Sequence, residues 1–335
     1  MKYKYFAALV LLLAGLLLYT LRSEEVFSRS AMAMNTIIRI GFKGHDNTLL
    51  DDAFALLSTL DNSLSMYNPS SDISRINDLA GISGVSVPDY VVDVVRRACL
   101  VHDSTGGVFN PLIGSLTRIW KINRDDGLIP SQESIDEAVK LSDISNLVLD
   151  SDSIFLKHKG CLLDLGGIAK GFAGDAIAEL FRRKGIKSAL IDLGGNICVV
   201  GKNFEGNDWR VGIRNPLNPH GSPVLIVNVR DCSVVTSGNY ERYKIHDGKK
   251  YSHFFDPKTG QSVMNDLLSV TVIDPDGSLA DGLATAFMTM GFDNAKAMIS
   301  KLNVKAVLIR NDGSIHASRS LKDIITAPKS AIELF

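Results

Sequence analysis

The sequence predicts an α+β protein whose core is an antiparallel-rich sheet with packed helices. Helical patterns occupy much of the chain before residue 185, whereas strand patterns follow one another beyond it with few helices between them. Short polar turns join several of these strands. A doubly wound fold would instead alternate strands with helices. The expected strands of the second half are 189–191, 197–200, 209–214, 224–229, 233–235, 269–273 and 304–309.

The first half is expected to begin with a strand at 36–42 and an amphipathic helix at 49–60. Residues 63–77 are polar and rich in turn formers, and they lead into a short helix. Tyr67 and the hydrogen-bonding side chains of this loop suit ligand contact, although a plain connector has the same composition. The remaining expected elements are helices at 88–104, with Pro88 in its first turn, 111–120 and 132–141, and a hairpin at 147–156 that turns near 150–153.

The chain has 335 residues and a net charge of −1, which is enough length for one large domain or two. A charge so close to zero argues against nucleic acid as the main partner. The four cysteines form no CxxC pair, and each has apolar neighbours in sequence. We expect buried small side chains rather than a zinc site or a disulfide framework at Cys99, Cys161, Cys198 and Cys232.

The N-terminus carries Lys2 and Lys4 before a nearly unbroken apolar run at 6–21. We interpret 1–22 as a secretion signal or membrane anchor and 23–33 as a linker to a domain at 34–335. A small-x-small cleavage site at 31–33 lies well beyond the run, which favours an uncleaved anchor. No cysteine follows the run, so it is not a lipoprotein signal. The basic start predicts attachment to the cytoplasmic membrane, with the domain facing the periplasm or the cell exterior.

One stretch combines an expected strand at 161–165, a turn on two glycines and the start of a helix that ends near Gly185. Such a junction directs free backbone N–H groups and a positive dipole end at one point. Lys170 adds a full charge there, so a phosphate is a natural ligand. The alternative is a tight turn whose glycines only allow close packing, because the stretch matches neither a Walker loop nor G-x-G-x-x-G.

A second stretch, 278–291, is expected to form a helix with Ser278 as N-cap and Gly291 as its end. Asp281 and Thr285 are four residues apart, so they lie on one face, where they can share one hard cation. Alternatively, Asp281 complements the helix dipole and Thr285 bonds back to a carbonyl. Mg²⁺ usually takes few protein ligands, so these two side chains and a loop carbonyl would suffice.

His253 lies near the end of an expected strand and precedes an Asp256-Pro257 turn. A neutral imidazole at this place can take a proton from an incoming hydroxyl. The alternative is a structural histidine.

Together these stretches resemble the FAD:protein FMN transferases, the ApbE-like family of flavin transferases. The resemblance extends from Met34 to the C-terminal strands and implies an ApbE-like fold. It depends on eight motifs in the same order: 33–36, 65–77, 106–111, 164–172, 192–196, 236–242, 253–260 and 280–286.

The resemblance implies that FAD binds in an extended pose and that Mg²⁺ bridges its pyrophosphate. FMN would pass to a threonine hydroxyl of a partner protein as a phosphoester, with AMP as the leaving group. The family suggests a subunit of a membrane redox pump as the acceptor. Two alternatives stay open: an FAD pyrophosphatase that uses water and gives FMN and AMP, and a flavin-binding protein without chemistry.

Residue by residue, the resemblance places Met34 and Tyr67 against the ring systems of FAD. It implies that Ala169 (through its carbonyl), Asp281 and Thr285 bind the metal. His253 is then the general base, and Lys170 neutralises the pyrophosphate. The other residues implied to contact FAD are Phe109, Asn110, Phe172 and Phe255.

Two positions depart from the family pattern. Asn110 stands where the family often has aspartate, so it carries no charge. Gly282 replaces an alanine, which loosens an exposed helix by about 1 kcal/mol.

Overall fold

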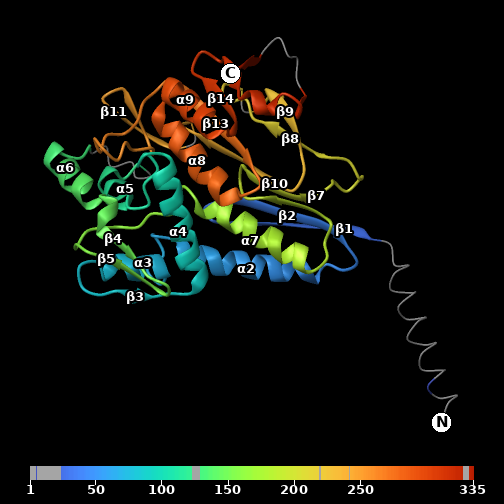
Figure 1. Cartoon of the computed structure of the whole chain (residues 1–335), viewed down its shortest axis with the longest axis horizontal. Helices are drawn as coiled ribbons and strands as arrows, with labels where there is room; N and C mark the ends of the chain where they lie inside the picture. The colour runs from blue at the N-terminus through green and yellow to red at the C-terminus, as the bar shows by residue number, and fades with distance from the viewer. Residues whose placement is uncertain (1–4, 6–23, 123–128, 219, 241, 327–331) are drawn as a thin grey trace.

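The computed structural model describes residues 5, 24–122, 129–218, 220–240, 242–326 and 332–335. Its centre is a nine-stranded sheet in the order β1-β2-β6-β7-β10-β13-β14-β15-β17, covered by helices (Figure 1). All neighbouring strands in it are antiparallel except β15 and β17. The predicted sheet-rich α+β core is therefore confirmed. The strands are β1 (Glu25–Ala33), β2 (Thr36–Gly44), β6 (Ser188–Asp192), β7 (Asn196–Gly201), β10 (Cys232–Gly238), β13 (Leu267–Asp274), β14 (Lys305–Arg310), β15 (Ile315–Ala317) and β17 (Ile332–Leu334).

Both faces of the central strands are buried, because successive side chains point to opposite sides. Val200 of β7 and Val235 of β10 belong to the larger core beneath the helices. Their neighbours Val199 and Val234 belong to a second core beneath a small sheet, β16-β9-β8. The strands therefore read as continuous apolar runs in the sequence. The covering elements are α2 (Thr48–Leu64), α7 (Ala169–Arg183), α8 (Gly277–Met290) and α9 (Phe292–Leu302), with β8 (Trp209–Ile213), β9 (Leu225–Val229) and β16 (Ile325–Thr326) on the other side.

A helical region lies beside the sheet and carries part of the site described below (Figure 1). The predicted hairpin at 147–156 is confirmed, with Asp150 N donating to Ser153 O at 2.9 Å. The helix expected from residue 111 begins only at Gly114, because Ile113 N bonds to Asn110 O and closes a turn first. The elements of this region are α3 (Asp72–Asp78), α4 (Asp89–Ser104), α5 (Gly114–Trp120), α6 (Gln132–Leu141), η1 (Ile144–Asn146), β3 (Val85–Ser86), β4 (Leu147–Leu149), β5 (Ser153–Leu156), β11 (Tyr243–His246) and β12 (Lys249–Ser252). The short helix η2 (Arg319–Leu321) instead belongs to the second core, beside β14.

The interpretation of 23–33 as a linker is wrong, because β1 pairs with β2 along its whole length. Met34 and Asn35 join the two strands with φ of 46° and 59°, the left-handed backbone of a tight hairpin turn. Backbone pairing holds β1 in place although most of its side chains are exposed, so its apolar pattern is weak.

The strand expected at 161–165 is also absent from the described ladders. Its polar backbone groups bond instead to a side chain and a loop. Leu163 N donates to Asn77 Oδ1 at 2.7 Å, and Asn77 Nδ2 donates to Leu163 O at 3.0 Å. Asp164 N donates to Pro111 O at 2.9 Å.

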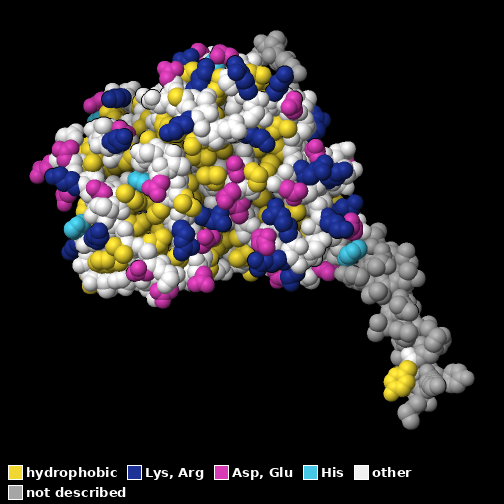
Figure 2. Space-filling model, in the orientation of Figure 1, with side chains coloured by type: hydrophobic (Ala, Val, Ile, Leu, Met, Phe, Trp, Pro, Cys, Tyr) yellow, Lys and Arg dark blue, Asp and Glu magenta, His cyan; other side chains and the backbone are white. Residues whose placement is uncertain are grey.

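The predicted anchor lies almost entirely outside the described residues, which include only residue 5 of the first 23. Among the described residues, no helix has both the length and the apolar character needed to cross a bilayer. Cys161, Cys198 and Cys232 are buried as expected, while Cys99 is half-buried. All four are free thiols. On the face shown in Figure 2, acidic and basic side chains are interspersed rather than gathered by sign.

Helices α7 and α8 cross in direct backbone contact, which brings two distant stretches of the sequence together. A Cβ on Gly171 would lie 2.0 Å from the carbonyl oxygen of Gly277 and 2.8 Å from the Cβ of Asp281. Only glycine permits this approach.

Gly171→Ala should therefore lower the free energy of unfolding by about 1–3 kcal/mol, because the helices must move apart. Gly174→Ala on the same helix is the matched control. There the new methyl meets its nearest neighbour at 3.4 Å, and alanine favours the helix by about 0.5–1 kcal/mol. Urea unfolding of the two variants checks this, and equal midpoints would contradict the close crossing.

Candidate active site

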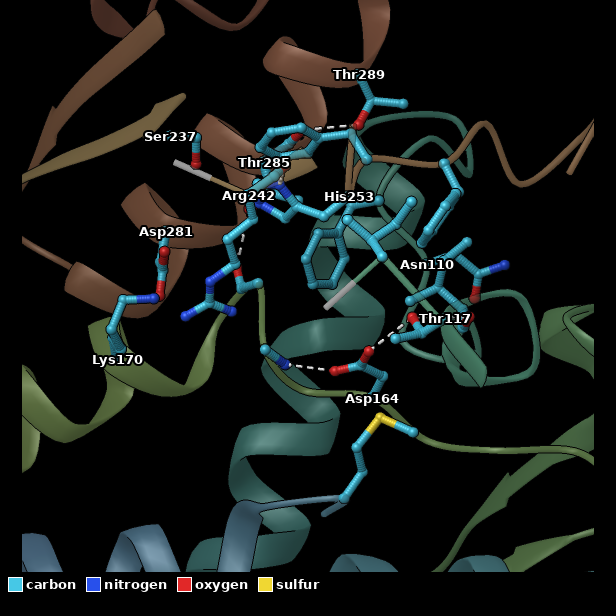
Figure 3. A pocket seen from close by; sticks show the side chains of 18 of the residues that line it. Asn110, Thr117, Asp164, Lys170, Ser237, Arg242, His253, Asp281, Thr285 and Thr289 are labelled. Carbon is cyan, nitrogen blue, oxygen red and sulfur yellow. Dashed lines mark hydrogen bonds between the residues drawn. The ribbon is translucent and has the colours of Figure 1, made fainter. Parts of the chain in front are cut away.

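A cleft of about 640 Å³ opens where α5, α7, α8, β10 and the segment after β12 meet (Figure 3). Its volume suits a ligand of dinucleotide size. The wall combines four cations, two carboxylates, one imidazole, several hydroxyls and aromatic rings. The cations, carboxylates and imidazole belong to Arg118, Lys121, Asp164, Lys170, Arg242, His253 and Asp281.

The glycine turn before α7 forms one side of the cleft. Asp164 Oδ1 accepts from Gly166 N at 2.9 Å, and its Oδ2 accepts from Thr117 Oγ1 at 2.9 Å. These bonds hold the turn and tie it to α5. A Cβ on Gly167 would lie 3.1 Å from both Phe109 and Thr285 side-chain atoms, so glycine lets the turn approach α8.

Asp281 and Thr285 of α8 face this turn from the other side. Gly171 N donates to Asp281 Oδ2 at 2.9 Å, and Thr285 Oγ1 donates to Gly167 O at 3.4 Å. Asp281 is only 3% exposed, and the Lys170 side chain extends into the same space (Figure 3). Sequence spacing put the carboxylate and the hydroxyl on one helix face, and the fold brings both to the glycine turn.

Ala169 does not fit the expectation of a turn carbonyl, because α7 begins at Ala169 itself. A carbonyl within a helix is already bonded, whereas those just before it are free to meet a ligand. Ala169 is buried and is not among the cleft residues. Gly167 occupies the turn, lines the cleft and directs its carbonyl oxygen toward Thr285. Because α7 already begins at Ala169, the candidate metal-binding carbonyl is that of Gly167, two residues before Ala169.

The N-terminus of α8 is fixed by two aspartates. Asp276, not Ser278, is the N-cap, and it accepts from Leu279 N at 2.9 Å. Ser278 instead bonds to Asp175 of α7. The Asp175 carboxylate accepts from Gly277 N at 2.8 Å and from Ser278 N and Oγ at 2.9 Å each. It thereby ties the two helices that carry the halves of the site.

Burial raises the pKa of Asp175 from 3.8 to about 6, against the effect of its three hydrogen bonds. A raised pKa in the folded state means that the carboxyl's contribution to stability is full below pH 3.8. That contribution is lost as the pH rises through about 6.

Asp175→Asn should remove this pH-dependent contribution to stability. The difference in unfolding free energy between wild type and variant should then change by up to about 3 kcal/mol between pH 4 and 7. Chemical denaturation across that range measures it, and a constant difference would contradict the assignment.

His253 follows directly after β12, as its expected place at a strand end required. Its Nδ1 lies 3.0 Å from the carbonyl oxygen of Arg242. A carbonyl only accepts, so Nδ1 carries the hydrogen and Nε2 keeps its lone pair. Burial, together with the positive charges of Arg242 and Lys170, lowers the pKa of His253 from 6.5 to about 4. The imidazole is therefore neutral at physiological pH.

Five of the residues expected to contact FAD line the cleft: Tyr67, Phe109, Asn110, Lys170 and Phe255. The Phe255 ring stacks on Trp120 with centroids 5.8 Å apart. Asn110 accepts from Leu112 N at 2.8 Å and donates through Nδ2 to Ser142 O at 2.7 Å. A carboxylate could not make the second bond. The uncharged residue at position 110 thus fits a turn-holding role.

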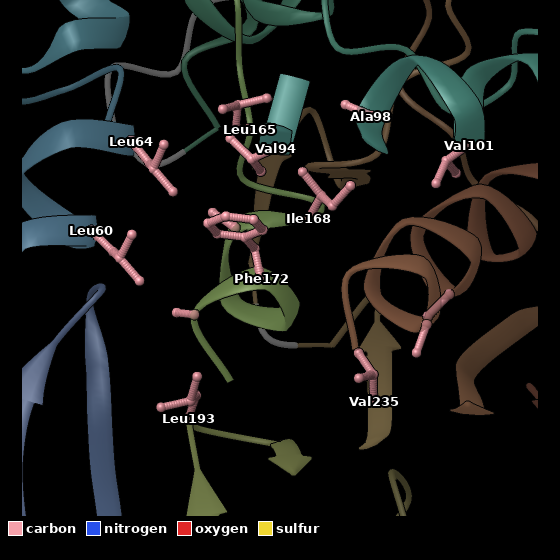
Figure 4. Packing of buried hydrophobic residues seen from close by; sticks show 14 of the residues in the cluster. Leu60, Leu64, Val94, Ala98, Val101, Leu165, Ile168, Phe172, Leu193 and Val235 are labelled. Atoms are coloured by element: carbon pink, nitrogen blue, oxygen red, sulfur yellow. The ribbon is translucent and has the colours of Figure 1, made fainter. Parts of the chain in front are cut away.

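Met34 and Phe172 are not among the cleft residues. Phe172 is buried in the main core, in the packing that Figure 4 shows with Leu165 and Leu193. Because each helical residue turns about 100°, Phe172 lies about 200° around α7 from Lys170 and faces the opposite side. Met34 occupies the β1–β2 turn, packs against the core and donates its N–H to Asp61 Oδ2 at 2.8 Å.

Sequence reasoning missed several cleft residues. Thr289 lies one turn beyond Thr285, so helical spacing alone could have found it. Arg118 and Lys121 belong to none of the eight motifs, and Arg242 ends the 236–242 motif without a role assigned to it. Only the fold brings the three to the cleft.

The fold and the site define a class: an α+β protein with a cation-lined, nucleotide-sized cleft that holds a carboxylate, a hydroxyl and a neutral imidazole. The chain belongs to the ApbE family, whose model matches residues 34–308. An FAD:protein FMN transferase of Treponema pallidum (strain Nichols) is 33% identical over 318 residues, which cover 89% of this chain and 88% of that protein. One from Klebsiella pneumoniae (strain 342) is 31% identical, with 87% of this chain and 92% of that protein covered.

Two solved structures show the same fold. The flavin transferase ApbE from Vibrio cholerae superposes with a TM-score of 0.81 at 28% identity, covering 90% of this chain and 99% of that one. The apo flavinyl transferase ApbE of Pseudomonas stutzeri gives 0.82 at 27% identity, with 92% and 99% covered. The expected ApbE-like fold is confirmed.

Proposed function

We propose that this chain is an FAD:protein FMN transferase, which moves FMN from FAD to a threonine hydroxyl of a partner protein and releases AMP. The observation that carries the proposal is the meeting of three distant stretches at one cleft. The glycine turn with Lys170, the Asp281 and Thr285 face of α8, and His253 all line it. The relatives that match most of the chain bear the name of this activity.

The residues present fit a Mg²⁺ ion. Asp281 is a buried carboxylate that accepts one backbone N–H, and a buried charge calls for a counter-charge. Its Oδ1, the Thr285 hydroxyl and the Gly167 carbonyl would hold the ion. Among the described residues no three His, Cys, Asp or Glu side chains gather in a metal-binding group. Such a sparse set suits Mg²⁺, which fills its shell with water and phosphate oxygens. When bound, the ion would offset negative charge on the diphosphate.

The cleft walls fit the rest of FAD. Phe109 and Phe255 offer aromatic surface to ring systems, and Tyr67, whose side chain is largely exposed, lies at the solvent side. Lys170 brings a positive charge to the α7 end, where it would neutralise the diphosphate. Phosphoryl-type transfer depends mainly on such positioning and charge neutralisation.

A residue of this chain can accept the proton that the threonine hydroxyl loses during transfer. His253 Nε2 takes the proton of the threonine hydroxyl as Oγ forms a bond to the FMN phosphorus. The phosphoanhydride bond breaks, and AMP leaves with the bridging oxygen. The lowered pKa of His253 keeps the base free of a proton at neutral pH.

The test uses the full chain in detergent with FAD, Mg²⁺ and candidate acceptor domains that contain threonine. A fluorescent acceptor band that survives denaturation supports transfer. Free FMN and AMP without labelled protein support an FAD pyrophosphatase, in which water replaces the threonine. Intact FAD supports a flavin-binding protein without chemistry.

The proposal also includes location. The apolar run at 6–21 lies just before β1, which supports a chain anchored in the cytoplasmic membrane with its domain in the periplasm or outside the cell. A subunit of a membrane redox pump would be a fitting acceptor. Carbonate extraction of membranes and protease digestion of intact spheroplasts test this. Release by carbonate, or protection from protease, would contradict it.

A further inference from the structure

Two cations at the C-terminal end of α5 are not explained by the chemistry above. Arg118 and Lys121 both line the cleft and are exposed. Within the described parts of the chain, neither side chain takes part in any of the ion pairs or hydrogen bonds observed. Several other arginines, such as Arg97 and Arg310, are paired with carboxylates. The α5 cation pair, Arg118 and Lys121, is therefore available to a ligand.

The backbone at Lys121 points to a role for its side chain. Lys121 is the C-cap of α5, with φ 45° and ψ 44° in the left-handed region. Glycine adopts this conformation without steric cost and is the common residue near helix ends, whereas lysine is disfavoured there. The fold alone would be served better by glycine. A strained residue in a cleft wall is a reason to look for a function.

FAD does not supply an anion for this pair. Both negative charges of FAD lie on its diphosphate, while the isoalloxazine and adenine rings are neutral at physiological pH. Lys170 and Asp281, which would meet the diphosphate, lie at one side of the cleft (Figure 3). Thr117, the neighbour of Arg118 on α5, lies at the other side with Asn110 (Figure 3). The α5 cation pair lines the cleft from α5, whereas the diphosphate would lie at the α7 and α8 side.

We propose that the α5 cation pair is a subsite for a carboxylate of the acceptor protein, carried in the segment that presents the target threonine. This rests on the proposed function, because it names the partner of the same site. A guanidinium binds a carboxylate through two parallel hydrogen bonds, and a lysine adds a mobile point charge. The pair would select acidic acceptor segments and fix their register in the cleft.

The experiment uses a peptide library in which each member has one central threonine and varied flanking residues. The full chain is supplied with FAD and Mg²⁺, and the labelled peptides are isolated by flavin fluorescence and sequenced by mass spectrometry. Wild type should enrich aspartate or glutamate at one or two positions. The double variant Arg118→Gln/Lys121→Gln should lose the enrichment, while Lys301→Gln, an exposed cation on α9, should keep it.

Kinetics on one enriched peptide then separate recognition of the acceptor from effects on FAD. The double variant should raise the KM for the peptide about 10-fold and the KM for FAD less than about 2-fold. Replacing the peptide's carboxylate by its amide should raise the wild-type KM to a similar extent, with no further effect in the double variant. Lys121→Gly removes the steric cost of the left-handed backbone at this position. This variant should lose the preference for acidic peptides without a lower melting temperature.

Three other results would overturn the proposed subsite. Labelled peptides without an acidic preference would overturn the subsite and leave the transferase proposal standing. An equal rise in the KM for FAD would mean that the cations only attract the dinucleotide to the cleft. If no peptide and no candidate acceptor domain is labelled, the proposed transfer fails and the subsite fails with it.

Discussion

Asp281→Ala should lower the rate of FMN transfer by about 100- to 1,000-fold, the loss typical when a charge-stabilising group is removed from an active site. The variant takes away the carboxylate that faces the glycine turn, so the proposed Mg²⁺ site would lose its carboxylate ligand. FAD binding should weaken without disappearing, because Lys170 and the aromatic wall remain. Transfer rates over a range of Mg²⁺ concentrations, with calorimetric Mg²⁺ binding in the absence of FAD, measure the two effects.

Three further variants make this result specific. Asp323→Ala, at an exposed aspartate outside the cleft, should transfer at the wild-type rate. Thr285→Ser keeps the hydroxyl and should retain more Mg²⁺ affinity than Thr285→Ala. If Asp281→Ala labels its acceptor as fast as wild type, the metal assignment is wrong.

His253→Ala should leave FAD bound and slow transfer by about 10²- to 10⁴-fold, the usual contribution of a general base. The wild-type rate should hold as the pH falls from 7 and drop only near pH 4, because protonation of Nε2 then removes the base. The variant should lose that acid limb. Single-turnover rates at saturating FAD, measured from pH 4 to 8, show both effects.

His158→Ala is the matched control, because His158 is exposed and does not line the cleft. An unchanged rate in His253→Ala would remove this residue as the base. Loss of FAD binding in the same variant would instead assign the imidazole to ligand binding.

Local patterns predicted most of the central sheet and the helices with clear amphipathic faces. The exceptions have physical causes. β1 is an edge strand with mostly exposed side chains, so the pairing that defines it leaves little trace in its composition. The segment at 161–165 has the apolar residues of a strand, but Asn77 takes its backbone bonds.

In the site, too, local patterns in the sequence predicted some residues, while others depend on contacts that only the fold creates. Asp281 and Thr285 could be paired from their spacing, because helix geometry relates residues four apart. The predicted turn carbonyl of Ala169 lies within α7 and that of Gly167 lies before it, because the exact start of α7 decides which carbonyl is free. Arg118 and Lys121 share the cleft with Lys170 only because α5 and α7 meet in the fold, and no local pattern carries that information.

The crossing of α7 and α8 joins residues 110 positions apart in the chain, through Gly171 N and Asp281 Oδ2. A ligand that touches both helices is bound only by the folded protein, so its binding energy adds to the stability of the entire domain. FAD supplied with Mg²⁺ should therefore raise the melting temperature in proportion to the logarithm of its excess over the dissociation constant. Unliganded enzyme, whose helix ends must hold a buried carboxylate without that help, should be the more easily degraded form in the cell.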